Sequence, residues 1–140
     1  MNVYDRWRNN FRISRSFIAV NLIYGAVALL LYGANERVFK PHFHLAFVQG
    51  HFNDVLATGL LLAYSNILIA LEGKRKFLLL SFHRVLLFSL IVGLGWEYLT
   101  PLYKSSTTDP LDLLAYGAGG IIYFGYMRLF ATVPPDLNPS

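Results

Sequence analysis

The sequence predicts an all-α, polytopic membrane protein in which four transmembrane helices form an antiparallel bundle. Two observations carry this prediction: the chain of 140 residues is 55% hydrophobic but only 14% charged, and its apolar residues fall into four long runs. Soluble domains carry about a quarter charged residues, and a chain of this length buries only about two-thirds of its surface on folding. The remaining apolar surface therefore needs lipid as its solvent.

Each apolar run has close to the number of residues that a helix needs to cross the hydrocarbon core, about twenty. The expected spans are residues 17–34, 52–71, 77–96 and 111–130, each bounded by charge, proline or glycine. No segment of ten residues alternates with the period of two that a membrane β-barrel strand requires. We expect one domain over residues 1–132, followed by a disordered tail over residues 133–140.

The basic residues predict the orientation of the bundle in the cell (cytoplasmic) membrane. Lysine and arginine are concentrated at the predicted inner side, at Arg6, Arg8, Arg12, Arg15, Lys74, Arg75, Lys76 and Arg128. The predicted outer side carries fewer, at Arg37, Lys40 and Lys104. Cytoplasmic loops carry the excess of basic residues, so both termini are expected in the cytoplasm.

Composition also narrows the range of partners and chemistries. The net charge is +4, but the basic residues form no continuous stripe of the kind that binds nucleic acid. The expected partner is the lipid bilayer, and the sequence leaves open a homo-oligomer or a membrane complex. The chain has no cysteine, which excludes disulfides, thiol catalysis and cysteine-based zinc sites.

Ionisable residues gather at the predicted outer end of the bundle. Asp54 and Asp112 each lie near the start of a spanning helix, where a carboxylate that faced lipid would be costly. His51 shares a helix face with Asp54, and Tyr116 shares one with Asp112. We therefore expect an outward-facing acidic pocket. Its candidate ligand-binding residues are Asp54, Glu97, Asp109, Asp112, His51 and Tyr116.

Helix capping is the alternative explanation for several of these residues. Asp109 is suited to the N-cap of the fourth helix, with Asp112 reaching back from its third position. Asn53 or His51 could cap the second helix in the same way. Glu97 is expected at the C-terminal end of the third helix, where the helix dipole disfavours a negative charge. Capping therefore does not account for Glu97.

Three histidines in the first outer loop raise the question of a metal. His42, His44 and His51 fall within ten residues, and an aspartate or glutamate could complete a site. Their spacing matches no established metal signature, and loop histidines are ordinarily surface residues. Both interpretations stay open, and no cofactor is specified.

The small and basic residues inside the expected spans predict how the helices pack and where a basic side chain lies. Glycines at Gly93, Gly95, Gly117, Gly119 and Gly120 are expected to let helices approach closely. Arg84, inside the third span, is expected either to extend its side chain to the headgroups or to pair with Asn66.

Residues 96–101 and 108–119 resemble the C-terminal signature of the VanZ-like membrane proteins, a family named for a protein linked to teicoplanin resistance. Glu97, Asp109, Asp112, Ala115 and Gly119 stand at matching positions. The sequence departs from the pattern at three places: it has Thr100 where the family often has Gln, Ser105 and Ser106 where an arginine is usual, and Tyr116 where it has Asn. The resemblance covers about thirty residues and implies a cell-envelope protein, but no particular reaction.

Three classes of function follow from these features. The first is a membrane protein whose outer acidic pocket binds a polar envelope ligand, a lipid-linked ligand or a cation. The second is an enzyme acting on a lipid-linked substrate, with Asp54, Glu97 and Asp112 as metal ligands or acid–base groups. The third is a small transporter or complex subunit in which the acids bind a coupling ion. No residue spacing specifies a reaction, which favours the first class.

Overall fold

The computed structural model describes residues 3–103 and 110–131, and every regular element in these ranges is a helix. The prediction of an all-α protein is confirmed for this part of the chain. The long helices are α1 (Val3–Ala34), α4 (Phe52–Leu71), α5 (Phe82–Tyr103) and α6 (Pro110–Phe130). The short elements are the π-helix η1 (Asn35–Phe39), α2 (Lys40–His42), α3 (Ala46–Gly50) and the 3-10 helix η2 (Arg75–Phe77).

Three helical stretches are long and apolar enough to cross a membrane: Arg15–His42, Phe52–Leu71 and Phe82–Leu99. Three of the expected spans thus have counterparts among the described residues. α6 is not one of the three. It still packs against both α4 and α5.

The boundaries of two expected helices are wrong. The first helix does not end at residue 34 but continues through η1 and α2 to His42, so much of the expected outer loop over residues 35–51 is helical. The third helix runs from Phe82 to Tyr103 and not over residues 77–96, because residues 78–81 take a non-helical path. The expected tail, residues 133–140, lies outside the described part of the chain.

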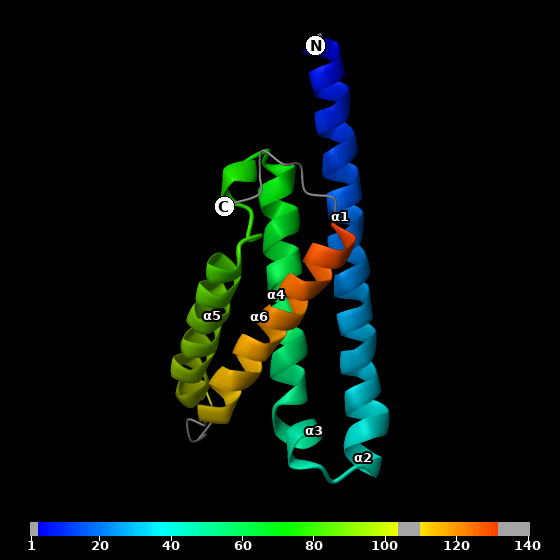
Figure 1. The fold of residues 1–140 in the computed structure, drawn as a ribbon. Helices are drawn as coiled ribbons and strands as arrows, with labels where there is room; N and C mark the ends of the chain where they lie inside the picture. Colours follow the sequence, from blue (N-terminus) through cyan, green and yellow to red (C-terminus); the bar gives the residue numbers. More distant parts are fainter. Residues whose placement is uncertain (1–2, 104–109, 132–140) are drawn as a thin grey trace.

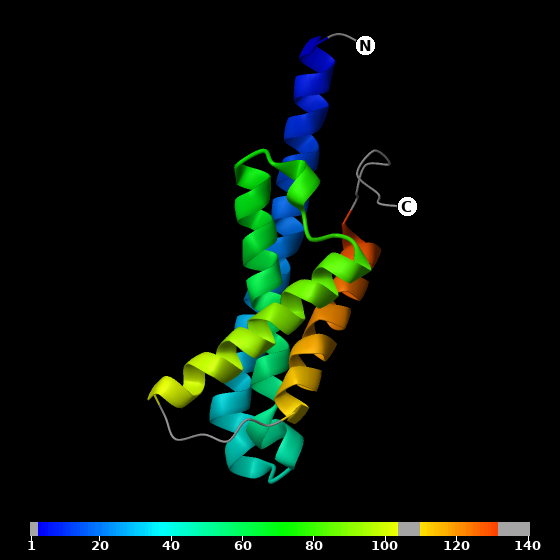
Figure 2. The same cartoon turned by 90° about the vertical axis from the view of Figure 1, so that its left-hand side faces the viewer.

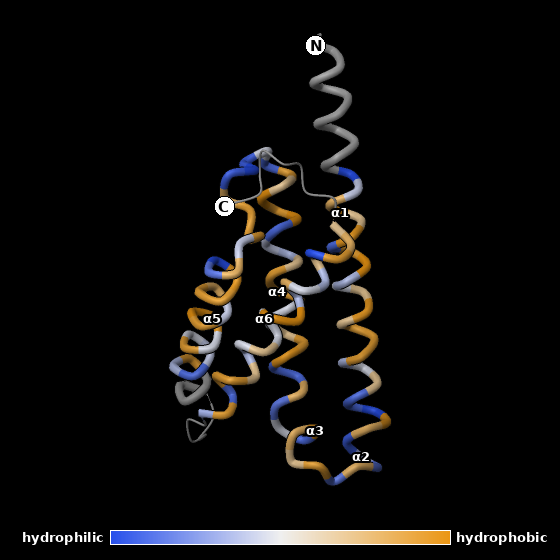
Figure 3. Tube along the Cα trace, viewed as in Figure 1, coloured by the Kyte–Doolittle hydropathy of each residue, from blue (hydrophilic) through white to orange (hydrophobic). Residues whose placement is uncertain are grey.

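The helices pack in a series. α1 lies along α4, α6 crosses α4 obliquely, and α5 packs on α6 (Figure 1). The C-terminal end of α5 extends away from α1 and α4, as the view turned by 90° shows (Figure 2). Apolar residues dominate residues 17–34 of α1, α4 and α5, whereas hydrophilic residues gather at the turn between α4 and α5 and at the end formed by η1 and α2 (Figure 3).

Glycines set the distances between α4, α5 and α6. A Cβ at Gly119 would lie 2.3 Å from the carbonyl oxygen of Val55 on α4, and one at Gly120 would lie 2.2 Å from Oγ of Ser89 on α5. Such close approach lets helices associate through backbone and small side chains. The packing role expected of Gly95 and Gly117 is wrong within the described part of the chain, since no atom of another described element lies within 4 Å of a Cβ placed there.

A buried hydrogen-bond network joins α1, α4 and α6. The Tyr123 hydroxyl, which is fully buried, accepts a hydrogen bond from Nδ2 of Asn66 at 2.7 Å and donates one to Oδ1 of Asn21 at 2.5 Å. The ring of Tyr24 contacts that of Tyr123 edge-on, with 5.1 Å between the ring centroids. Polar contacts between apolar helices of this kind hold membrane bundles together.

The pairing of Arg84 with Asn66 that was considered from the sequence is wrong, because both side chains have other partners. The Asn66 side chain bonds Tyr123 and the backbone of Leu79, whereas Arg84 donates from Nη1 to the carbonyl oxygens of Lys76 and Leu78. Because α5 begins at Phe82, Arg84 lies in the first turn of the helix, and its side chain is exposed.

Candidate functional site

Two helix starts bring the candidate site together. α4 begins directly after His51 and carries Asp54 in its first turn, and α6 carries Asp112 in its first turn. α6 crosses α4 where Gly119 meets Val55, so these two helix starts lie at the same end of the bundle. His51 and Asp112, which are 61 positions apart in the chain, thereby become neighbours.

The centre of the site is a pair formed by His51 and Asp112. Nδ1 of His51 lies 2.6 Å from Oδ1 of Asp112, a hydrogen bond in which the imidazole donates to the carboxylate. The two side chains are partly buried, with 17% and 27% of their surface exposed. One potential ligand atom from each of His51, Asp54 and Asp112 lies within 4.8 Å of the others.

Tyr116 adds a hydroxyl from the next turn of α6. Its side chain is 3% exposed, and its hydroxyl donates to Oδ1 of Asp54 at 3.2 Å. Gly93 on α5 leaves space for the ring, because a Cβ there would lie 2.9 Å from Cδ2 of Tyr116. We call His51, Asp54, Asp112 and Tyr116 the polar cluster. Sequence reasoning selected all four as site candidates.

Glu97 is a half-buried residue of α5 and does not belong to the polar cluster. It sits inside α5, six positions before the helix ends at Tyr103, so the expectation that it ends a helix is wrong. It is not one of the three potential metal ligands found within 4.8 Å of one another. Asp109 lies outside the described residues.

The capping explanations considered for His51 and Asn53 are wrong. His51 occupies the N-cap position of α4 but makes no side-chain cap hydrogen bond, since its Nδ1 is used by Asp112. Asn53 donates from Nδ2 to Oε1 of Glu36 at 2.6 Å. Asp112 bonds His51 across the helix interface. The His51 and Asn53 side chains therefore join separate helices rather than closing the start of α4. The capping role expected of Asp112 involves Asp109, which lies outside the described residues.

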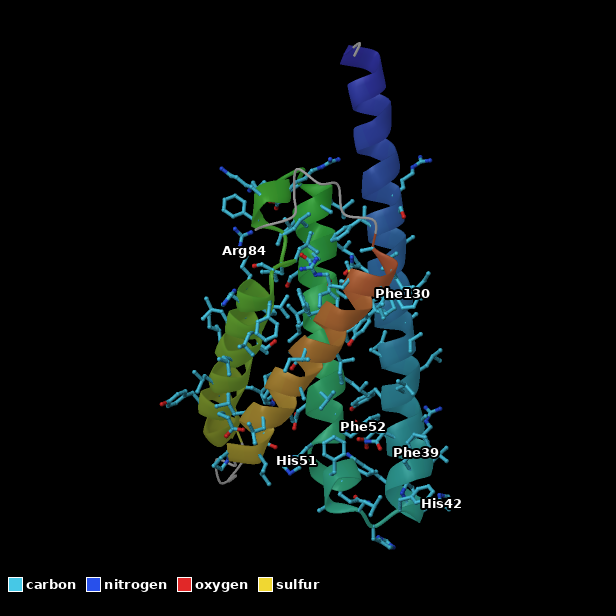
Figure 4. The ribbon with its side chains drawn as sticks, in the orientation of Figure 1. Phe39, His42, His51, Phe52, Arg84 and Phe130 are labelled. Atoms are coloured by element: carbon cyan, nitrogen blue, oxygen red, sulfur yellow. The ribbon has the colours of Figure 1, made fainter. Side chains whose placement is uncertain are left out.

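The outer histidines do not form the three-histidine group considered from the sequence. His42 and His44 are exposed, and Nδ1 of His42 lies 2.7 Å from the carbonyl oxygen of Val38, one turn back on its own helix. In the described ranges, the group of potential metal ligands contains His51 but neither of the other two. Figure 4 shows His42 at the far end of the continuous helix formed by α1, η1 and α2, and His51 next to α6.

Sequence reasoning missed Asn35, which lies beside the polar cluster's helix. It is fully buried in the π-helix η1, and its Nδ2 donates to Oδ1 of Asn53 at 2.9 Å. Within the described residues its Oδ1 has no hydrogen-bond partner. The sequence did contain a signal that could have identified Asn35, because this asparagine directly follows a long apolar run. A polar side chain in such a position needs a hydrogen-bond partner within the protein.

The charges of the polar cluster do not balance. Two carboxylates face one imidazole, and no ion pair between described residues places a lysine or arginine on Asp54 or Asp112. A partly buried carboxylate without a counter-charge is unfavourable. One nitrogen and two oxygen ligands suit a divalent transition-metal ion, and Tyr116 would orient one of the carboxylates from the second shell.

No protein-family model, curated protein or solved structure matches this chain.

Proposed function

We propose that this chain is an integral protein of the cell membrane that binds a divalent cation at the polar cluster, on the extracytoplasmic side. The observation that carries the proposal is the approach of His51, Asp54 and Asp112, whose potential ligand atoms lie within 4.8 Å of one another although they come from two helices. A cation would neutralise the excess negative charge there. Its remaining coordination positions would admit an anionic group of an envelope or lipid-linked ligand.

The proposal includes four crossings, with α6 as the fourth and both termini in the cytoplasm. The support for α6 is its surface: it packs against α4 and α5 on one side and exposes large apolar side chains on the other. The exposed apolar residues of α6 include Leu114, Ile121, Ile122 and Leu129. An apolar face of this kind is suited to lipid.

The proposal also treats the chain as a divergent VanZ-like protein. One residue of the matching motif supports this, because Asp112 belongs to the polar cluster. Tyr116 stands where the family has asparagine, and its hydroxyl supplies a hydrogen-bond donor at that position.

Calorimetric titration of the purified protein in lipid nanodiscs with Zn²⁺ tests the cation site. We expect one ion per chain, with affinity that falls as the pH is lowered because protons compete for the ligands. Asp54→Asn and Asp112→Asn should each weaken binding at least tenfold. Glu36→Gln is the matched control, since Glu36 is an exposed carboxylate at the same end that is paired with Lys40.

Two results would refute the proposal. One is the absence of saturable binding by the folded protein. The other is an equal loss of affinity in Asp54→Asn and Glu36→Gln, which would show that the ion only responds to the general negative charge of this end.

A further inference from the structure

The turn between α4 and α5, at the opposite end of the bundle from the polar cluster, concentrates positive charge. Residues 72–84, the basic turn, contain four lysine and arginine side chains and a single carboxylate, Glu72. Glu72 forms an ion pair with Lys74, in which Oε2 of Glu72 lies 2.8 Å from Nζ of Lys74. The hydrogen bond of this pair raises the pKa of Lys74. The pair is neutral overall. Lys76 and Arg84 lie outside this pair.

The backbone of the basic turn is fixed by hydrogen bonds and burial. Phe77 N donates to Lys74 O at 3.0 Å, and Leu78 N donates to Arg75 O at 3.1 Å. The side chain of Leu78 is 6% exposed and belongs to the hydrophobic core, so the turn is anchored to the bundle. A ligand that bound here would meet a preorganised surface, which lowers the entropy cost of binding.

Arg84 folds back onto this turn. Its Nη1 donates to Lys76 O at 2.8 Å and to Leu78 O at 3.3 Å. These hydrogen bonds hold the guanidinium beside the turn. Among the described residues they engage Nη1 alone, so a phosphate would bond the N–H groups of Nε and Nη2. The planar guanidinium matches the geometry of phosphate oxygens. Figure 4 shows Arg84 beside the turn, at the start of α5.

Exposed aromatic rings flank these cations. Phe77 is 55% exposed and Phe82 is 42% exposed, and Nζ of Lys76 lies 5.0 Å from the centroid of the Phe77 ring. A soluble anion would need the cations but would gain nothing from the rings. A phospholipid uses both, because its phosphate meets the cations while its acyl chains meet the rings at the membrane surface.

The position of the basic turn in the fold is also suited to a phospholipid. It joins two helices that are each long and apolar enough to cross a membrane, Phe52–Leu71 and Phe82–Leu99. Arg84 and Lys76 therefore lie where one end of these helices meets the headgroup region. We propose that the basic turn binds the headgroup of an anionic phospholipid, with Arg84 and Lys76 contacting the phosphate and Phe77 and Phe82 contacting the acyl chains.

Native mass spectrometry tests this site. The protein is released from nanodiscs that contain equal amounts of phosphatidylglycerol and phosphatidylcholine, and the lipids retained per chain are counted. We expect wild-type protein to retain phosphatidylglycerol preferentially. Lys76→Gln and Arg84→Gln should each reduce that retention several-fold. Lys76→Gln keeps the backbone carbonyl that Arg84 uses, so it preserves the turn even where Arg84→Gln disturbs it.

The control variant is Arg37→Gln, which removes the same charge from an exposed arginine in η1. It should leave phosphatidylglycerol retention unchanged. Equal retention of the two lipids by wild type would overturn the proposal, and so would equal losses in Arg37→Gln and Lys76→Gln. A further arm adds inorganic phosphate: displacement of the lipid at millimolar phosphate would assign the site to a soluble anion and refute the lipid.

Discussion

Asn66 satisfies both backbone polar groups of Leu79. Its Oδ1 accepts from Leu79 N at 2.7 Å, and its Nδ2 donates to Leu79 O at 3.2 Å. The chain around Leu79 is not helical, so its backbone groups lack the partners that a helix supplies. Irregular backbone is tolerated among apolar helices only where protein groups take the place of those partners. Asn66 is such a group, and it fixes where α5 begins.

Asn66→Leu should therefore destabilise the protein. The substitution removes the partner of Leu79 and one hydrogen bond to Tyr123, and each buried polar group left unpaired costs about 1–3 kcal/mol. We expect a loss of at least about 2 kcal/mol in the free energy of unfolding, measured by denaturation in detergent micelles. Ser65→Ala, on the preceding residue of α4, should change stability by less than about 0.5 kcal/mol. Equal stability of the two variants would contradict the structural role of Asn66.

The contact between α4 and α6 should be sensitive to one methyl group. In Gly119→Ala the Cβ would lie 2.3 Å from Val55 O, a backbone atom that can move only with its helix. Forcing such an overlap costs about 1–3 kcal/mol. Gly117→Ala places its Cβ in open space and should raise stability by up to about 1 kcal/mol through helix propensity. Thermal unfolding that ranks the two variants in the opposite order would show that α6 does not pack as described.

Two buried tyrosines on α6 should separate binding from stability. Tyr116→Phe removes the hydroxyl that donates to Asp54 and should weaken Zn²⁺ binding about tenfold, as second-shell changes do. Tyr123→Phe removes the hydroxyl that joins Asn66 to Asn21 and should lower the unfolding temperature while leaving Zn²⁺ affinity of the folded protein unchanged. Calorimetry and thermal melting of both variants provide the comparison. Unchanged Zn²⁺ affinity in Tyr116→Phe would remove Tyr116 from the site.

The four-crossing topology can be tested directly, because the chain contains no cysteine. Single cysteines introduced at His44, Lys74 and Pro135 report on the two sides of the membrane. A membrane-impermeant maleimide should label the cysteine at position 44 in intact cells, and those at 74 and 135 only after the membrane is opened. Labelling at 135 in intact cells would show that α6 does not cross the membrane.

The sequence and the structure agree best where one local property decides the element. α4 spans Phe52–Leu71, the range expected from the apolar run, because charged residues and glycine bound it on one side and polar residues on the other. The end of α5 was missed because Glu97 was taken as a boundary. A helix can continue past a carboxylate, so the position of Glu97 in the sequence does not show where α5 ends.

The sequence by itself determined that the chain is helical and apolar enough for a membrane, and that histidine, aspartate and tyrosine gather at one end. These properties follow from composition and from the period of single segments. Only the tertiary structure decided that His51 bonds Asp112, that Tyr116 bonds Asp54, and that His42 and His44 stand apart. The reason is geometric: the close approach at Gly119 and the oblique crossing of α6 set which side chains meet, and both depend on contacts between residues far apart in the chain.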